Sequence, residues 1–277
     1  MNPDWLMPDW PAPPHVKAVF TSRGIAETGF ASKSGVSQPP FDAFNLGDHV
    51  GDDPTHVMAN RHMLQVLIGA KPVYLKQVHS TEVATLHPKT PHGTVADACI
   101  TTEKKLACTI MVADCLPVLF TDLEGSFVAA AHAGWRGLAN GVLNTTVKTI
   151  LEKKNDAAGV LYAYSATNII AWLGPCIGPA VFEVGPEVKA TFAEKLPNSA
   201  AYLKSTGNSK PDKYLADLAG LARLNLQQLG LLANNIYGND GSADWCTVSN
   251  PSRYFSHRRD AVRLGSSGRL AGCIWLA

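Results

Sequence analysis

Residues 126–137, with the sequence SFVAAAHAGWRG, place the strongest constraint on how this chain can fold. A run of small and apolar residues ends in His132, and two glycines and Arg136 precede an amphipathic run at 138–151. This order predicts a buried strand, a polar turn and a helix. In α/β architectures, side chains converge on ligands at the carboxyl end of a strand. We therefore expect His132 and Arg136 at a functional sheet edge, where the glycines permit close approach of the backbone.

Two further apolar runs end or break at a residue that can bind a metal. Residues 73–78 lead into His79, and an acid and Cys115 interrupt the run 109–120. Spacings of 36 residues from His79 to Cys115 and 17 from Cys115 to His132 exclude a zinc finger, whose ligands come in close pairs. If the strands pair, the three side chains meet and leave zinc an open fourth position. Taken singly, such histidines and cysteines are more often ordinary packing.

Short strands separated by turn residues make up most of the chain. They are expected at 16–21, 73–78, 82–86, 98–101, 106–112, 116–120, 126–131, 169–173 and 269–276, with helices at 54–68, 141–153 and 214–229. Few gaps between strands could hold a helix, which favours antiparallel or mixed pairing over a series of crossovers. We find no repeat, linker or break in composition. The sequence therefore predicts a single α+β domain over residues 1–277, with mixed β-sheets flanked by helices.

The region before residue 54 contains few regular elements. Residues 1–14 form a proline-rich N-terminal arm, in which Trp5 and Trp10 either pack on the body or belong to a disordered tail. Residues 22–53 are expected to form a long loop, a feature that is often functional. Asn45 in this loop either points to a ligand or forms a turn.

The helix at 54–68 carries clear end signals and one unexpected charge. Asp53 is a good N-cap before Pro54, and Gly69 is a typical stop. Arg61 lies on the same face as the apolar stripe, so its guanidinium needs an anionic partner. That partner is either a phosphate or substrate, or an aspartate of the protein.

Two aspartates could support a metal site. Neighbours on a strand point to opposite faces, so Asp114 is not expected to bind the same metal as Cys115; it either orients a neighbouring group or pairs with an arginine. Asp97 is a candidate for fixing a metal-bound histidine, because such histidines usually donate their other N–H to a carboxylate or carbonyl. We interpret residues 257–259, His-Arg-Arg, as a solvated face.

Charge and composition narrow the classes of partner. The net charge of +1 gives no footprint for nucleic acid. No run of about 18 apolar residues predicts a membrane helix. The N-terminus lacks a signal-peptide pattern, and six unevenly spread cysteines fit a reducing compartment. We expect a cytoplasmic protein with small-molecule partners, no nucleic acid and no membrane.

Five longer motifs occur in order along the chain. They are KQVH at 76–79, ADCLPVLF at 113–120, HAGWRG at 132–137, LGPCIGP at 173–179 and FEVG at 182–185. With them the chain resembles the bacterial YfiH/YlmD-like family, long labelled multicopper polyphenol oxidoreductase (laccase) and later linked to purine nucleoside metabolism. The resemblance implies that His79, Cys115 and His132 hold zinc and are catalytic. Asn45, Arg61, Gln77 and Arg136 are the residues expected to bind substrate or phosphate.

The activity that the resemblance implies is phosphorolysis of adenosine, inosine, guanosine or methylthioadenosine, together with adenosine deamination. Deamination suits a water activated by zinc. The zinc-deaminase signature H-x-E with P-C-x-x-C is absent, so deamination must use a different set of residues. Phosphorolysis needs a cationic phosphate pocket, for which Arg61 and Arg136 are the candidates.

Three other functions remain open from the sequence. One Cys and two His could bind copper, but none of the nine histidines forms the His-x-His pairs of a laccase, so copper ranks below zinc. A cysteine hydrolase could use Cys115 as nucleophile with a histidine as base; it would act on amide bonds such as those of peptidoglycan precursors, to which the family is also linked. The last alternative is a metal- or ligand-binding protein without catalysis.

Overall fold

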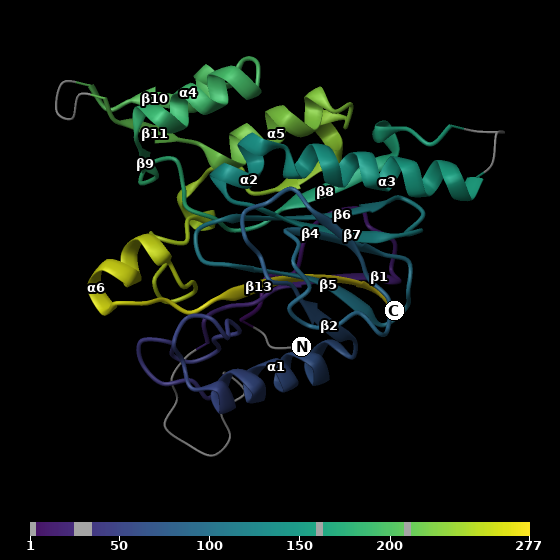
Figure 1. The fold of residues 1–277 in the computed structure, drawn as a ribbon, viewed down its shortest axis with the longest axis horizontal. Helices are drawn as coiled ribbons and strands as arrows, with labels where there is room; N and C mark the ends of the chain where they lie inside the picture. The colour runs from purple at the N-terminus through teal and green to yellow at the C-terminus, as the bar shows by residue number, and fades with distance from the viewer. Residues whose placement is uncertain (1–3, 25–34, 159–162, 208–211) are drawn as a thin grey trace.

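Two β-sheets lie face to face at the centre of this computed structural model (Figure 1), which describes residues 4–24, 35–158, 163–207 and 212–277. The strands are β1 (Val16–Phe20), β2 (Lys71–Tyr74), β3 (Val83–Thr85), β4 (Ala98–Thr101), β5 (Leu106–Val112), β6 (Leu116–Asp122), β7 (Val128–Ala133), β8 (Ile169–Leu173), β9 (Glu183–Val184), β10 (Leu203–Ser205), β11 (Tyr214–Ala216), β12 (Ile236–Gly238) and β13 (Leu270–Leu276). One sheet has the order β1-β13-β5-β2 and the other β12-β8-β6-β7-β4-β3. A smaller sheet, β10-β11-β9, lies beside them.

Helices cover the outer faces of both large sheets (Figure 1). The helices of the described residues are α1 (Pro54–Ile68), α2 (Trp135–Asn140), α3 (Val142–Ala158), α4 (Pro186–Lys195), α5 (Leu218–Gln228) and α6 (Val262–Leu264). The apolar face of α1 packs on the four-stranded sheet, and α2, α3 and α5 pack on the six-stranded sheet. Pairing within the large sheets is mostly antiparallel, but β2 with β5, β3 with β4 and β12 with β8 are parallel. The predicted α+β fold with mixed sheets is confirmed.

Alternation of side chains along β7 explains how the strand serves two cores. Val128 and Ala130 face the other sheet, whereas Ala129 and Ala131 face the helices. His132 continues the row that begins with Val128 and Ala130, at the end of the strand. The apolar run that fixes the strand therefore also delivers the imidazole to the edge between the two sheets.

Several predicted elements are wrong in their extent, and for two of them the structure shows the physical reason. The strand expected over 73–78 ends at Tyr74, because the carboxylate of Asp97 accepts the N–H groups of residues 78–80 and draws them away from the sheet. The helix expected from 214 begins at Leu218, and the residues before it form β11. The side chain of Asp217 accepts the N–H of Gly220 at 2.8 Å and so fixes the helix start.

The described part of the N-terminal arm packs on the body. Leu6 pairs with Phe20 in an antiparallel bridge, and Trp5 is buried against Phe44 with ring centroids 5.5 Å apart. Residues 1–3 of the predicted arm and 25–34 of the predicted loop lie outside the described residues. Across the described ranges, every helix is too short or too polar to cross a membrane.

Candidate metal centre and adjoining pocket

His79, Cys115 and His132 come together at one end of the two sheets. Their ligand atoms all lie within 4.8 Å of one another. His132 lies on β7 opposite Pro117 of β6, and Cys115 directly precedes β6, so the β6–β7 pairing brings these two side chains together. His79 arrives from the loop after β2, with its Nε2 3.7 Å from the Cys115 Sγ. The predicted three-ligand group therefore exists as a spatial cluster.

One buried carboxylate holds this arrangement. Asp97 is fully buried and accepts hydrogen bonds from the N–H groups of Val78, His79 and Ser80. These bonds hold His79 at a φ of 60°, which is uncommon for a residue other than glycine. The same carboxylate lies 2.8 Å from the Nδ1 of His132. That bond directs the Nε2 of His132 towards the cluster, the arrangement of a metal-bound histidine.

Electrostatics favour a thiolate beside an imidazolium within this cluster. Burial alone would raise the pKa of Cys115, but the charge of His132 and hydrogen bonds from both histidines lower it to about 6. Burial alone would lower the pKa of His132, but the Cys115 thiolate and Asp97 raise it to about 9. Burial also opposes ionisation of Asp97, yet the His132 hydrogen bond and backbone N–H groups lower its pKa to about 2. The thiolate that a metal needs is thus already formed at neutral pH.

The donor set fits a single zinc or copper ion. Nitrogen and sulfur ligands around tetrahedral zinc lie roughly 3.3–3.6 Å apart, given the usual bond lengths. The pair His79 and Cys115, 3.7 Å apart, is close to this range, and the whole group lies within 4.8 Å, somewhat wider than a bound ion requires. Gly134 closes the other side: a Cβ there would lie 2.8 Å from the Cys115 Sγ and 2.8 Å from the His79 Cδ2. Space around the ligands, not backbone conformation, therefore requires glycine at this position, since its φ is −64°.

Asp114 serves a different part of the molecule. Residues 113–115 form a bend rather than the predicted strand, and Asp114 has a φ of 83°. Its carboxylate accepts the hydroxyls of Thr247 at 2.6 Å and Ser256 at 3.1 Å, and the backbone N–H of Arg258 at 2.6 Å. The prediction of opposite strand faces was wrong. Asp114 instead ties the C-terminal segment to the bend that carries Cys115.

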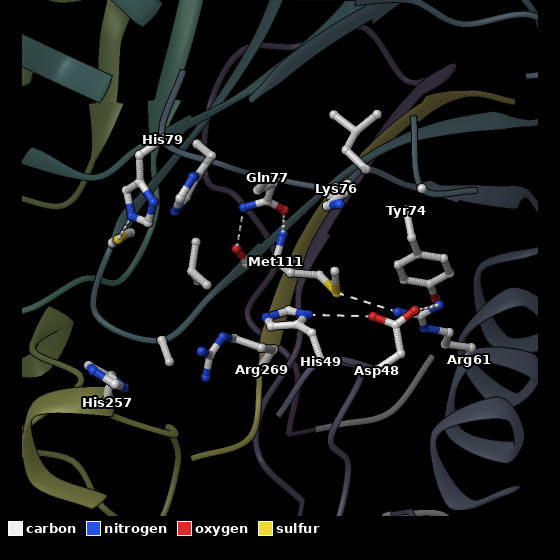
Figure 2. A pocket seen from close by; sticks show the side chains of 16 residues that line it. Asp48, His49, Arg61, Tyr74, Lys76, Gln77, His79, Met111, His257 and Arg269 are labelled. Carbon is white, nitrogen blue, oxygen red and sulfur yellow. Dashed lines mark hydrogen bonds and ion pairs between the residues drawn. The ribbon is translucent and has the colours of Figure 1, made fainter. Parts of the chain in front are cut away.

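A cleft of about 710 Å³ opens onto the cluster, within the size range of small-molecule sites. Figure 2 shows His79 at one end and Arg61, Tyr74 and Asp48 at the other. We call the end at His79 the metal end. The loop end comprises Arg61, Tyr74 and Asp48 together with the segment before α1 and its contact with the backbone of Arg269. Further wall residues include Lys76, Gln77, His257 and Arg269. The cleft therefore joins a three-ligand group to several cationic side chains.

Arg61 and Gln77, which are expected from the sequence to bind substrate or phosphate, both line this cleft. Arg61 donates from Nε to the carbonyl of Leu46 at 2.9 Å, pairs with Asp48 at 3.2 Å, and stacks 4.0 Å from the Tyr74 ring centroid. It thus pairs with an aspartate and borders the pocket at the same time. The Gln77 amide exchanges two hydrogen bonds of 2.8 Å with the backbone of Met111, which fixes it to β5.

Asn45 and Arg136 are not among the residues that line the cleft. Asn45 is fully buried, and its amide bonds to Gly47, Asp52 and the backbone N–H of Arg269. The turn-forming interpretation describes it better than the ligand-facing one. The exposed Arg136 places its guanidinium 4.4 Å from the ring centroid of its neighbour Trp135.

Sequence reasoning missed His49, His257 and Arg269 as lining residues of the cleft. The interpretation of the His-Arg-Arg segment as a solvated face is wrong for Arg259, because this side chain pairs with Asp260 and donates to three carbonyl groups. Arg269 stands at the start of the predicted strand 269–276, where no local pattern signals its role. Only the pairing of distant segments reveals it.

The family described as multi-copper polyphenol oxidoreductase laccase matches residues 27–277. The chain belongs to this YfiH/YlmD-like family. A Pseudomonas aeruginosa relative named purine nucleoside phosphorylase is 41% identical over 272 residues, covering 98% of each chain. The Escherichia coli purine nucleoside phosphorylase YfiH is 41% identical over 274 residues, again covering 98% of each chain.

Solved structures of the YfiH/YlmD-like family share the same fold. The crystal structure of the Neisseria meningitidis protein NMB0706 matches with a TM-score of 0.83 and 41% identity, over 99% of each chain. YlmD from Geobacillus stearothermophilus matches with a TM-score of 0.80 and 28% identity, over 95% of this chain and 92% of that one. The description of the family refers to oxidation, whereas the names of the two relatives refer to purine nucleosides.

Proposed function

We propose that this protein is a zinc-dependent purine nucleoside phosphorylase that works in the cleft. The observation that carries the proposal is the cleft itself, which joins the group His79, Cys115 and His132 to a wall with cationic side chains. The names of the Pseudomonas and Escherichia relatives support the substrate class. Adenosine, inosine, guanosine and methylthioadenosine are the proposed substrates.

Phosphorolysis sets clear demands on such a site. A phosphate oxygen bonds to the ribose C1′ as the bond from C1′ to the purine nitrogen breaks, and the base leaves with that electron pair and a proton. A zinc ion with three protein ligands supplies Lewis-acid chemistry at its fourth position. Asp97 keeps the His132 imidazole oriented for such an ion. Met111, Val112 and Ala113 offer apolar surface for a purine ring.

Zinc fits this site better than multicopper chemistry does. The described residues contain one three-ligand cluster of this kind, whereas four-electron reduction of oxygen uses several redox metals. All six cysteines are free thiols, which supports a reducing, cytoplasmic setting. Adenosine deamination is a further part of the proposal, because an open metal position can also activate water.

The test is chromatography of inosine reactions with and without phosphate. We expect the wild type to form hypoxanthine and ribose 1-phosphate only when phosphate is present, and His132→Ala to form neither. His62→Ala, which changes an exposed histidine of α1, is the matched control and should behave as wild type. Absence of hypoxanthine from the wild type, or equal amounts from His132→Ala, would contradict the proposal.

One observation favours a cysteine hydrolase as the second candidate. Cys115, His132 and Asp97 form a chain of thiolate, imidazolium and carboxylate that resembles a nucleophile with its base and orienting acid. A hydrolase of this kind would need neither metal nor phosphate. Activity on an amide substrate that survives a chelator but is lost on thiol alkylation would favour it over the phosphorylase.

A further inference from the structure

Arg269 differs from the other arginine of the cleft in how its donors are used. Its Nη1 donates to the carbonyls of Ser267 at 2.7 Å and Gly268 at 3.1 Å. Within the described ranges, no carboxylate pairs with it and no partner engages its Nε or Nη2. The Nε–Nη2 edge carries two parallel N–H donors, the geometry that binds a phosphate or carboxylate with two hydrogen bonds.

Neighbouring residues hold Arg269 in this position. The Oδ1 of Asn45 accepts its backbone N–H at 2.8 Å, and its carbonyl accepts the N–H of Leu46 at 3.1 Å. A Cβ on Gly47 would lie 2.6 Å from the Arg269 Cγ, so the glycine leaves room for the aliphatic stem. Figure 2 shows the guanidinium pointing into the cleft on the side where His257 lies. The free edge is therefore presented in advance of any ligand.

The charge of Arg269 lacks the compensation that Arg61 has. Arg61 already gives Nη1 to Asp48, Nε to the carbonyl of Leu46 and its face to Tyr74. Arg269 is half-buried, and burial lowers its pKa from the usual arginine value. The Cys115 thiolate and Asp114 attract this charge and partly offset the shift, but neither contacts the guanidinium. A partly desolvated cation without a contacting carboxylate favours binding of an anion.

We infer that Arg269 binds the phosphate co-substrate through Nε and Nη2, with Asn45 as its positioning residue. The inference rests on the proposed phosphorolysis and assigns its anion subsite. An oxygen of the bound hydrogen phosphate bonds to C1′ while the C1′–N bond breaks, and the phosphate's proton ends on the departing base. Arg61 then orders the loop end of the cleft, and Arg136 stays outside it.

The test compares Arg269→Lys with Arg61→Lys in inosine phosphorolysis. Lysine keeps the charge but loses the two-donor edge, so we expect Arg269→Lys to raise the KM for phosphate by about 10- to 100-fold. The KM for inosine and the zinc content should stay within about twofold, the scatter of a site that loses no contact. Arg263→Lys, an exposed change in α6, is the matched control. An unchanged phosphate KM in Arg269→Lys, or an increase confined to Arg61→Lys, would overturn the assignment.

Two further measurements separate this inference from the function it rests on. In Arg269→Ala, added guanidinium ion at millimolar concentration should restore part of the phosphate affinity, which a merely structural role would not allow. Calorimetric titration of zinc-loaded protein with inorganic phosphate, without any nucleoside, should show binding. Arg269→Lys should weaken this binding, even if the protein does not react with nucleosides. If Arg269→Lys weakens inhibition by inosine 5′-monophosphate and leaves inorganic phosphate unaffected, the subsite serves nucleotides and the inference is wrong.

Discussion

The two ends of the cleft are held in place in different ways. At the metal end, one carboxylate, Asp97, fixes both the His79 loop and the His132 imidazole, and β6 and β7 bring Cys115 alongside. At the loop end, the segment before α1 meets β13 through Asn45 and Arg269, which are 224 residues apart. The metal end is thus a compact hydrogen-bonded unit, whereas the loop end depends on a long-range contact. Changes at one end should leave the other end nearly intact.

The largest effect is expected from removing a ligand. Wild-type protein should purify with about one zinc per chain, as a three-ligand catalytic site requires, and Cys115→Ala should lose it. Cys273→Ala removes a buried thiol that lies away from the cluster and is the control. Phosphate binding at Arg269 should survive in both variants. One zinc per chain in Cys115→Ala, measured by atomic absorption, would contradict the assignment of Cys115 as a zinc ligand.

Asp97→Asn should have the next largest effect. The amide keeps the size of the side chain but cannot accept every N–H that the carboxylate now accepts. We expect zinc affinity to fall about 10- to 100-fold, as for other partners of metal-bound histidines, and the free energy of unfolding to fall by about 3 kcal/mol. Competition with a zinc-binding dye and urea denaturation measure the two. The exposed change Asp9→Asn should alter neither quantity.

Asn45→Ala tests the loop end in the same way. It leaves the backbone N–H of Arg269 and part of Asp52 without a partner, so we expect the free energy of unfolding to fall by about 1–3 kcal/mol. The KM for phosphate should rise while zinc content stays as in wild type. Asn140→Ala, at the exposed end of α2, is the comparison variant. Zinc loss in Asn45→Ala would show that the two ends are coupled.

The smallest effect is expected in the number of protons that the protein releases when zinc binds. Between pH 6 and 9 the metal-free site holds a deprotonated Cys115, whose pKa is about 6, and a protonated His132, whose pKa is about 9. Zinc binding must therefore displace one proton from His132 in this range, fewer as the pH rises above 9, and an additional one from Cys115 as it falls below 6. Calorimetry in buffers of different ionisation enthalpy measures the number. If the number of protons released from Cys115 and His132 does not change across pH 9, the two residues do not form a thiolate–imidazolium pair.

The metal end could be predicted from sequence because apolar runs carry its ligands. Strands β4, β5 and β8 follow the predicted ranges to the residue, since each is a continuous apolar run between turn residues. The caps of α1 likewise follow from Asp53 and Gly69. The end of β2 could not be predicted, because a carboxylate almost twenty residues away in sequence sets it.

The loop end could not be predicted from local sequence patterns, again because contacts between distant segments determine it. Arg269 opens an apolar strand, and nothing nearby in the sequence shows that its stem lies against Gly47 or that its N–H bonds to Asn45. The helical pattern predicted from residue 214 was also overridden. Asp217 caps α5, and the three residues before it pair with β9 as strand β11. Contacts between distant segments, rather than periodicity, decide these positions.

The measurement that tests the central claim most directly is the stoichiometry of inosine phosphorolysis before and after zinc removal. Zinc-loaded protein should form hypoxanthine and ribose 1-phosphate in equal amounts and consume one phosphate for each. Chelator-treated protein should form neither until zinc is restored, and protein with Cys115→Ala should stay inactive after the same addition. Equal product formation with and without zinc, or hypoxanthine formed without consumption of phosphate, would contradict a zinc-dependent phosphorylase in this cleft.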